Sequence, residues 1–171
     1  TQQPEYVLWF LRSSTVDAAT VEAGSVRRIL TSLSGEGSHS VAQAFMKAWK
    51  IDTQVEYIHD WKRLSDENDY VIPDDIDAVC GGKEPADEQT LRAVDRLAAA
   101  GFRLANADLG ARVANLDYLK PVVVPRGYLQ TIPPYPTEAV ATYSVVTHLV
   151  ARRNLTPRLL AVAAGLIDGN P

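Results

Sequence analysis

The chain has 171 residues, 46% of them hydrophobic, and a formal net charge of −4. This length and hydrophobic content are enough for one buried core, so we expect a single α/β domain over residues 1–171. The negative charge and the scattered lysines and arginines argue against a nucleic-acid surface or a polybasic membrane patch. The longest apolar stretch, residues 159–167, is too short to cross a bilayer, which takes ~20 residues.

Segments with strand and helix character alternate over the first two thirds of the chain. Apolar and β-branched runs predict strands at residues 6–11, 26–33, 54–58, 76–80 and 102–107. Helical spacing of apolar residues predicts helices at residues 16–23, 38–50, 59–68 and 85–100, the last ending before Gly101. This alternation is typical of an α/β fold with a mostly parallel sheet covered by helices.

The last third of the chain has a different pattern. Five prolines between residues 120 and 137 interrupt any long element there. Residues 141–151 are apolar and β-branched, and they predict a long strand. Thr156 and Pro157 then supply an N-cap and a first helical residue, which predicts a final helix.

A turn of small and polar residues, Gly35 to Ser40, joins the second predicted strand to the helix that follows. Backbone N–H groups in the first turn of a helix lack intrahelical acceptors, and the helix dipole is positive there. Carboxylates and phosphates bind at such places, so we expect an anion or a polar small molecule at this turn. An ordinary N-cap turn without a ligand is the alternative. The turn matches neither nucleotide-binding glycine motif, so we expect no cofactor.

The remaining reactive residues do not predict catalysis or metal binding. The three histidines, His39, His59 and His148, lack zinc-type spacing, and the single Cys80 excludes an internal disulfide. We expect the pair His59-Asp60 to cap a helix and Cys80 to be a buried structural thiol. Ser40 stands where a nucleophile elbow needs its last glycine, which disfavours a serine hydrolase. We therefore expect no metal and no catalytic residue.

Several segments, in order, resemble the TAXI-type solute receptors of TRAP transporters. Residues 6–12 resemble the strand that enters the second lobe of these receptors, and Gly35 to Ser40 resembles their glycine-serine-glycine-threonine turn. Residues 75–82 resemble the acidic-hydrophobic-Asp-Ala strand of type II periplasmic binding proteins. Residues 118–128 resemble the family's Pro-x-Gly loop, followed as there by an apolar strand and by Leu-Thr-Pro at residues 155–157.

The resemblance implies one lobe of a type II periplasmic-binding-protein-like fold. A second-lobe-like core would span about residues 5–120, and a Pro-rich return with a C-terminal strand and helix would span residues 121–171. It implies a non-enzymatic receptor for a small organic anion, such as a dicarboxylate or an amino acid. Its partner would be a membrane transporter component, and its location periplasmic or membrane-anchored outside the cytoplasm. The ligand-binding residues implied by the matched motifs are Gly37, Ser38, His39, Ser40, Gly81, Gly82 and Tyr128.

The chain departs from the family pattern in three ways. His39 stands where the turn has its second glycine, and Tyr128 where the loop has a small residue, so either side chain could obstruct a ligand. Only the second lobe and the return are matched, so the chain is either a piece of a longer receptor or a one-lobed relative.

Two other hypotheses remain open. One is a ligand-free sensory or protein-interaction module on the same fold, with a signalling partner. The other is a hydrolase that uses Ser38 or Cys80 beside a histidine. We also expect a homodimer, because the aromatic strand at residues 6–10 needs a cover.

Overall fold

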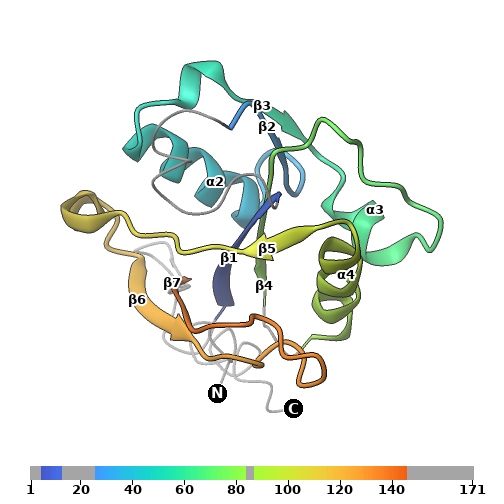
Figure 1. The fold of residues 1–171 in the computed structure, drawn as a ribbon. Coiled ribbons are helices and arrows are strands. Elements are labelled where there is room, and N and C mark those ends of the chain that lie inside the picture. Colours follow the sequence, from blue (N-terminus) through green and yellow to red (C-terminus); the bar gives the residue numbers. More distant parts are fainter. Residues whose placement is uncertain (1–4, 13–25, 84–86, 146–171) are drawn as a thin grey trace, which may run out of the picture.

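The computed structural model describes residues 5–12, 26–83 and 87–145. The strands of this part share one seven-stranded sheet in the order β3-β2-β4-β1-β7-β6, with β5 also paired to β1 (Figure 1). The strands are β1 (Glu5–Arg12), β2 (Arg28–Leu30), β3 (Glu56–Ile58), β4 (Ala78–Lys83), β5 (Phe102–Leu104), β6 (Leu119–Val124) and β7 (Val140–Val145). The α-helices are α2 (Gly37–Ala48), α3 (Trp61–Asp66) and α4 (Glu88–Ala99), and the short 3-10 helices are η1 (Asp52–Gln54) and η2 (Gly110–Asn115).

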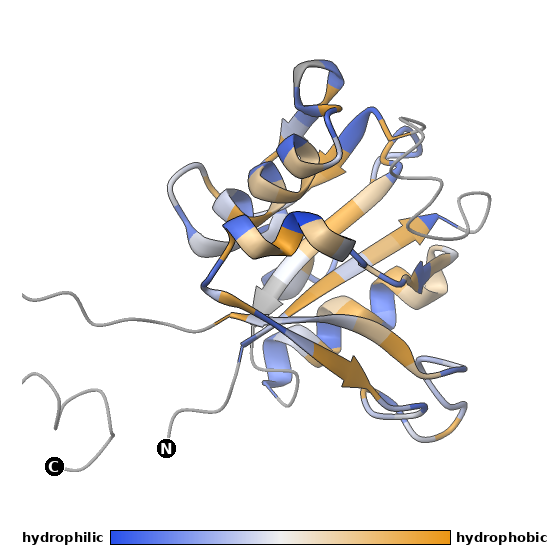
Figure 2. Ribbon diagram, turned by 90° about the vertical axis from the view of Figure 1, so that its left-hand side faces the viewer, coloured by the Kyte–Doolittle hydropathy of each residue, from blue (hydrophilic) through white to orange (hydrophobic). Residues whose placement is uncertain are grey.

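Helices cover both faces of the sheet. Successive side chains of a strand point to opposite faces, so the two faces of β1 meet different helices. Val7, Trp9 and Leu11 pack in the cluster that contains the buried face of α2. Leu8 and Phe10 pack in the cluster that contains α3 and α4. Because both faces of the sheet are covered, long parts of the strands are hydrophobic, as Figure 2 shows.

The predicted aromatic strand is thus the buried β1 near the middle of the sheet. Its residues from Val7 to Leu11 are at most 2% exposed. β4 covers one edge of β1, while β7 pairs with its first residues and β5 with its last. The chain itself covers this strand, so the premise on which we expected a homodimer does not hold.

The chain is an α/β protein, but its sheet is mixed, so the prediction of a mostly parallel sheet is wrong. β2 is parallel to β3 and β4, whereas β1 is antiparallel to β4, β5 and β7, and β6 is antiparallel to β7. The intervening helices do keep β2, β3, β4 and β5 in one direction, as the alternation predicts. β1 lies between β4 and β5 and runs the opposite way, and no periodicity in the sequence reveals that insertion.

Predicted helices agree with the structure better than predicted strand ends. The helices expected at residues 38–50, 59–68 and 85–100 correspond to α2, α3 and α4. β4 continues through Gly81 and Gly82, where we expected it to end, because both glycines pair with β1.

The structure also contains a strand, β6, in a part of the chain where the prolines led us to expect no long element. β6 includes Pro121, which a strand at the edge of a sheet tolerates because that edge needs no further donors. The strand expected at residues 141–151 is confirmed as β7 up to Val145. Its remainder, the helix expected at residues 16–23 and the final helix from Thr156 lie outside the described residues.

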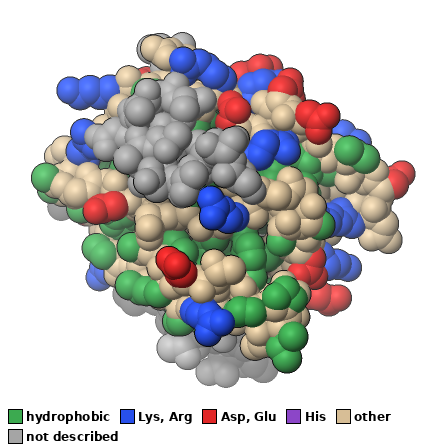
Figure 3. All heavy atoms as spheres, viewed as in Figure 1, with side chains coloured by type: hydrophobic (Ala, Val, Ile, Leu, Met, Phe, Trp, Pro, Cys, Tyr) green, Lys and Arg blue, Asp and Glu red, His purple; other side chains and the backbone are tan. Residues whose placement is uncertain are grey.

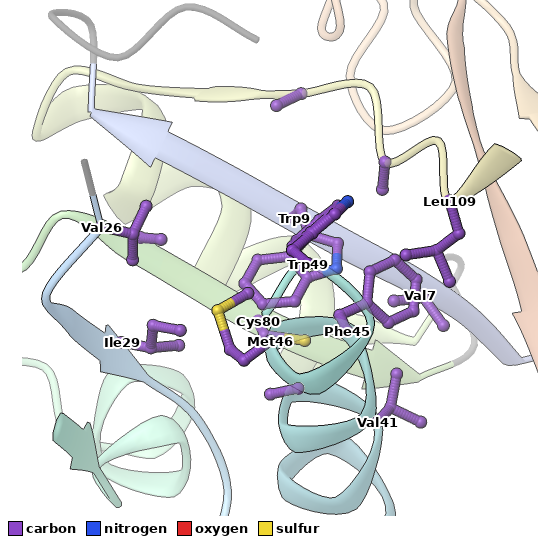
Figure 4. Packing of buried hydrophobic residues seen from close by; sticks show 14 of the residues in the cluster. Val7, Trp9, Val26, Ile29, Val41, Phe45, Met46, Trp49, Cys80 and Leu109 are labelled. Carbon is purple, nitrogen blue, oxygen red and sulfur yellow. The ribbon is translucent and has the colours of Figure 1, made fainter. Parts of the chain in front are cut away.

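An aromatic cluster holds α2 against the sheet (Figure 4). The ring centroids of Trp9, Phe45 and Trp49 lie between 5.3 and 5.9 Å apart. Each such pair contributes ~0.5–1.5 kcal/mol beyond its buried area. Met46 and Cys80 pack in the same cluster. This packing fixes the position of α2, and with it the position of the turn that begins the helix.

Candidate functional site

A cleft of about 760 Å³ lies between the first turn of α2 and helix α3. Its walls include Ser32, Gly37, Ser38, His59, Trp61 and Lys62. The segments that follow β2 and β3 both contribute to it, and these two strands are parallel neighbours. The carboxyl ends of parallel strands are the place where open α/β sheets commonly bind ligands.

The turn between β2 and α2 shapes one wall of the cleft. The N–H of Glu36 donates to Leu33 O at 3.0 Å, and Gly35 has a φ of +89°, which glycine adopts most readily. The Glu36 carboxylate in turn accepts the N–H of Leu33 at 3.3 Å. Helix α2 then begins at Gly37, so its N-terminus opens on the cleft.

The first turn of α2 offers a ligand the backbone N–H of Gly37. Ser32 Oγ accepts the N–H of His39 at 3.1 Å, and Glu36 O accepts that of Ser40 at 3.1 Å. The N–H of Gly37 has no acceptor among the described residues. A Cβ atom at Gly37 would meet nothing within 4 Å, so the space over this residue is open. A carboxylate oxygen suits such a donor at the positive end of a helix.

Two histidines lie at and behind the cleft wall. His59 Nδ1 donates to Ser32 O at 2.7 Å, since a carbonyl oxygen can only accept. The ring of His39 contacts those of His59 and Tyr57, at centroid distances of 4.9 and 5.0 Å. His39 is 5% exposed, and its burial, together with the nearby His59, lowers its pKa. Of the pair expected to cap a helix, Asp60 is the N-cap residue of α3, without a side-chain cap hydrogen bond. The ring of His59 instead ties the segment after β3 to the end of β2.

Gly81 contributes to the cleft through another residue. Trp61, the first residue of α3, lines the cleft and is 4% exposed. A Cβ atom at Gly81 would lie 2.3 Å from Cη2 of Trp61, so only glycine lets the indole pack this close to β4. Gly81 does not line the cleft itself, and neither does Gly82, which pairs with Val7 of β1.

Ser40 and Tyr128 also lie away from the cleft. Ser40 Oγ donates to Glu36 O at 3.1 Å. The Tyr128 ring stacks on that of Tyr6 with a centroid distance of 6.3 Å and is 46% exposed. Of the seven residues implied by the resemblance, the structure brings Gly37 and Ser38 together in the cleft wall. The residues that it places outside this wall are His39, Ser40, Gly81, Gly82 and Tyr128.

Carboxylates outnumber cationic side chains in the cleft. Lys62 is the cationic side chain that the described residues contribute to the wall. The carboxylates of the wall are those of Glu5, Glu36, Asp66 and Asp87. In the part of the chain that the structure describes, none of these four forms an ion pair. The backbone at the α2 N-terminus therefore favours negative charge, while the acidic side chains of the wall, Glu36 at the N-cap included, favour positive charge.

Cys80 and His59 are two of the groups that the hydrolase hypothesis would use. Cys80 is fully buried, which raises the pKa of its thiol, and Sγ contacts Ser38 O at 3.9 Å. His59 Nδ1 bonds to a main-chain carbonyl, whereas a triad histidine is oriented by a carboxylate. In residues 5–12, 26–83 and 87–145, no three His, Cys, Asp or Glu side chains gather so that they could hold a metal ion.

The rest of the described surface has smaller hollows. One of about 350 Å³ lies beside β6, β7 and η2, and one of about 220 Å³ lies beside β5 and Pro136. Charged side chains of both signs are interspersed on the face that Figure 3 shows. No described helix is both long enough and apolar enough to span a membrane.

Several residues of the cleft wall were not expected from the sequence, among them Ser32, His59, Trp61 and Lys62. Ser32 and His59 each follow the carboxyl end of a strand, so the rule that ligands bind at such ends could have identified both. Trp61 and Lys62 carried no such signal, because their place depends on how α3 packs against β4.

Comparisons with protein-family models and with curated proteins found no match for this chain. A function can be proposed on two grounds. One is the cleft at the N-terminus of α2, and the other is that several segments resemble those of solute receptors in the same order along the chain.

Proposed function

We propose that this chain is the binding lobe of a solute receptor, and that it holds a small carboxylate-bearing metabolite at the N-terminus of α2. The observation that carries the proposal is the open cleft with Gly37 and Ser38 in its wall. A ligand carboxylate there accepts the N–H of Gly37 in the favourable field of the helix dipole. A hydrogen bond to a charged group contributes about 1.5–3 kcal/mol, so a few such contacts give measurable affinity.

Two observations favour a binding lobe over a ligand-free interaction module. The module would be supported if His39 or Tyr128 filled the space over Gly37. His39 is instead buried against Tyr57 and His59, and Tyr128 stacks on Tyr6. The space over Gly37 is open.

The receptor's partner is a membrane transporter component outside the cytoplasm, as the resemblance implies. A second wall, from a facing lobe or from the partner, would exclude water and strengthen the polar contacts to the ligand. Ligand binding would then favour the closed arrangement, which is the one that the partner recognises.

The test is thermal unfolding of the chain with a panel of small carboxylates. A ligand at a hundred times its dissociation constant stabilises the folded state by about 2.7 kcal/mol. For a chain of this size we expect a rise in Tm of about 5–10 °C. The Gly37→Trp variant fills the open space over Gly37, and we expect it to abolish the rise.

Ala99→Trp is the matched control, because Ala99 is exposed in the last turn of α4 and does not line the cleft. It should keep the full rise in Tm. The proposal fails if no carboxylate raises Tm, or if Gly37→Trp responds to ligand as the unmodified chain does.

A further inference from the structure

We propose that His39 makes the first turn of α2 sensitive to acid: protonation of its ring releases this turn from the sheet and opens the cleft wall. The inference goes beyond the proposed function, because it concerns the wall itself and holds whether or not a ligand binds there. It rests on the contacts of the buried His39 ring, on the missing partner of its Nδ1 atom, and on the hydrogen bonds that Ser32 makes.

The ring of His39 lies between α2 and the sheet with almost no access to water. The residue is 5% exposed, and its Nδ1 atom is buried without a hydrogen-bond partner among the described residues. The ring contacts those of Tyr57 in β3 and His59 after β3, at centroid distances of 5.0 and 4.9 Å. A neutral imidazole suits these contacts, whereas an imidazolium needs an acceptor for each of its two N–H groups. A proton on the folded ring would therefore leave a buried charge without compensation.

The other titratable groups on the strands around His39 give a cation no counter-charge. Burial raises the pKa of Tyr57 to about 12 and also raises the pKa of the Cys80 thiol, so both groups are neutral in acid. His59 lies against the His39 ring and can only add positive charge. The first turn of a helix is a positive end as well, which disfavours a cation at this place.

The acidic side chains of the neighbouring elements do not pair with His39. The carboxylate of Glu36, at the N-cap of α2, accepts a backbone N–H of the preceding turn. Asp52 of η1 acts on Tyr57. Within the described residues no ion pair joins His39 to an acid. Burial and the nearby His59 lower the pKa of His39, and no carboxylate opposes this shift.

Ser32 links the position of His39 to the cleft wall. Its hydroxyl accepts the N–H of His39 at 3.1 Å, and its carbonyl accepts from His59 Nδ1 at 2.7 Å. Ser32 lines the cleft together with Gly37 and Ser38, which precede His39 in the same turn. A protonated His39 ring gains water when this turn moves away from the sheet, and that movement breaks the bond to Ser32 Oγ. Acid therefore opens the wall at the start of α2.

The rest of α2 is held by contacts that acid does not change. Phe45 and Trp49 pack with Trp9 of β1, at ring-centroid distances between 5.3 and 5.9 Å. Such aromatic contacts carry no titratable group. We therefore expect a local opening of the first turn, at a pH at which the remainder of the helix stays packed on the sheet.

The experiment measures amide hydrogen exchange by NMR on the ¹⁵N-labelled chain without ligand, between about pH 7.5 and 5. The N–H of His39 is released when its bond to Ser32 Oγ breaks, so its protection factor reports opening of the turn. Below pH 6.5 we expect this protection factor to fall, by up to about tenfold per pH unit, until the pH reaches the lowered pKa of His39. Low concentrations of urea should leave it unchanged, because a local opening exposes little surface. The amide of Phe45, in the buried middle of α2, should be more strongly protected and should lose protection in urea.

Two variants assign the effect to one of the two histidines. His39→Phe keeps an aromatic ring in this place but cannot be protonated, so the protection factor at position 39 should no longer depend on pH. His59→Asn keeps a donor for Ser32 O and removes one of the two causes that lower the pKa of His39. In this variant the fall in protection should persist and be smaller.

Four results would overturn the inference. They are a protection factor at His39 that stays constant below pH 6.5, an equal fall in His39→Phe, loss of the fall in His59→Asn, and a urea dependence at His39 equal to that at Phe45. The last result would mean that the whole domain unfolds rather than the first turn. Because no ligand is added, none of these results bears on whether the cleft binds a carboxylate.

Discussion

The Gly81→Ala substitution tests how β4 and α3 build the cleft wall. The new Cβ atom would lie 2.3, 2.6 and 2.8 Å from Cη2, Cζ3 and Cζ2 of Trp61. Carbon atoms in contact prefer about 3.5–4.0 Å, so the indole must move by roughly 1 Å. Overpacking of this kind destabilises by about 1–3 kcal/mol, and the lower unfolded-state entropy of alanine offsets about 0.4–1 kcal/mol. We expect a net loss of about 1–2 kcal/mol in urea unfolding.

Two further variants separate this clash from a general effect of replacing glycine. Gly37→Ala has nothing within 4 Å of its Cβ atom and lies in a helix, so it should be neutral or stabilising by up to about 1 kcal/mol. In a Trp61→Leu background the loss from Gly81→Ala should nearly vanish, because the contacting ring is gone. Unchanged stability of Gly81→Ala, or an equal loss in both backgrounds, would refute the reasoning.

Three more predictions concern the elements around the cleft. Ser32→Ala removes the acceptor for the N–H of His39 and should lower the free energy of unfolding by about 1 kcal/mol, whereas Ser40→Ala, at an exposed hydroxyl, should change it by less than about 0.5 kcal/mol. The pKa of His39 is lowered from 6.5 in the folded chain. Between that lowered pKa and 6.5, His39 is therefore protonated in the unfolded chain and neutral in the folded chain. The free energy of unfolding should therefore fall as the pH drops through 6.5 towards the lowered pKa. Urea unfolding at several pH values measures this dependence, and His39→Asn should remove the part that His39 contributes. An unchanged dependence of stability on pH in this variant would contradict the assignment to His39. Arg96→Ala removes the guanidinium that donates to Leu64 O, Glu67 O and Asn68 Oδ1, and should lower the urea midpoint by the equivalent of about 1–3 kcal/mol, with no effect expected if these bonds do not form in solution.

The sequence was sufficient to predict the elements that depend on local pattern. The spacing of Val41, Phe45 and Trp49 predicted α2, and the apolar run from Val7 to Leu11 predicted a buried strand. Gly101 ends α4 as expected, with a φ of +81°. The direction of β1 and the strand around Pro121 could not be predicted, because both depend on which segments pair in the folded sheet.

The sequence predicted the wall of the candidate site at the start of α2, but not the wall formed by α3 and the segment before it. Small residues before an amphipathic helix identified Gly37 and Ser38, since a helix N-terminus is a local feature. Trp61 and His59 come to the cleft through contacts with Gly81 and Ser32, which are distant in sequence. The acidic residues of the wall come from separate segments of the chain, so no local run of acidic residues indicated that carboxylates would gather in the cleft.

The measurement that bears most directly on the central claim follows the backbone amide signals of the first turn of α2 by NMR. The chain, labelled with ¹⁵N, is titrated with the small carboxylate that raises Tm most. The account predicts saturable shifts of the Gly37 and Ser38 amides with one dissociation constant, and little change at the exposed end of α4. Saturation without movement of these two amides, or movement confined to another surface, would contradict it.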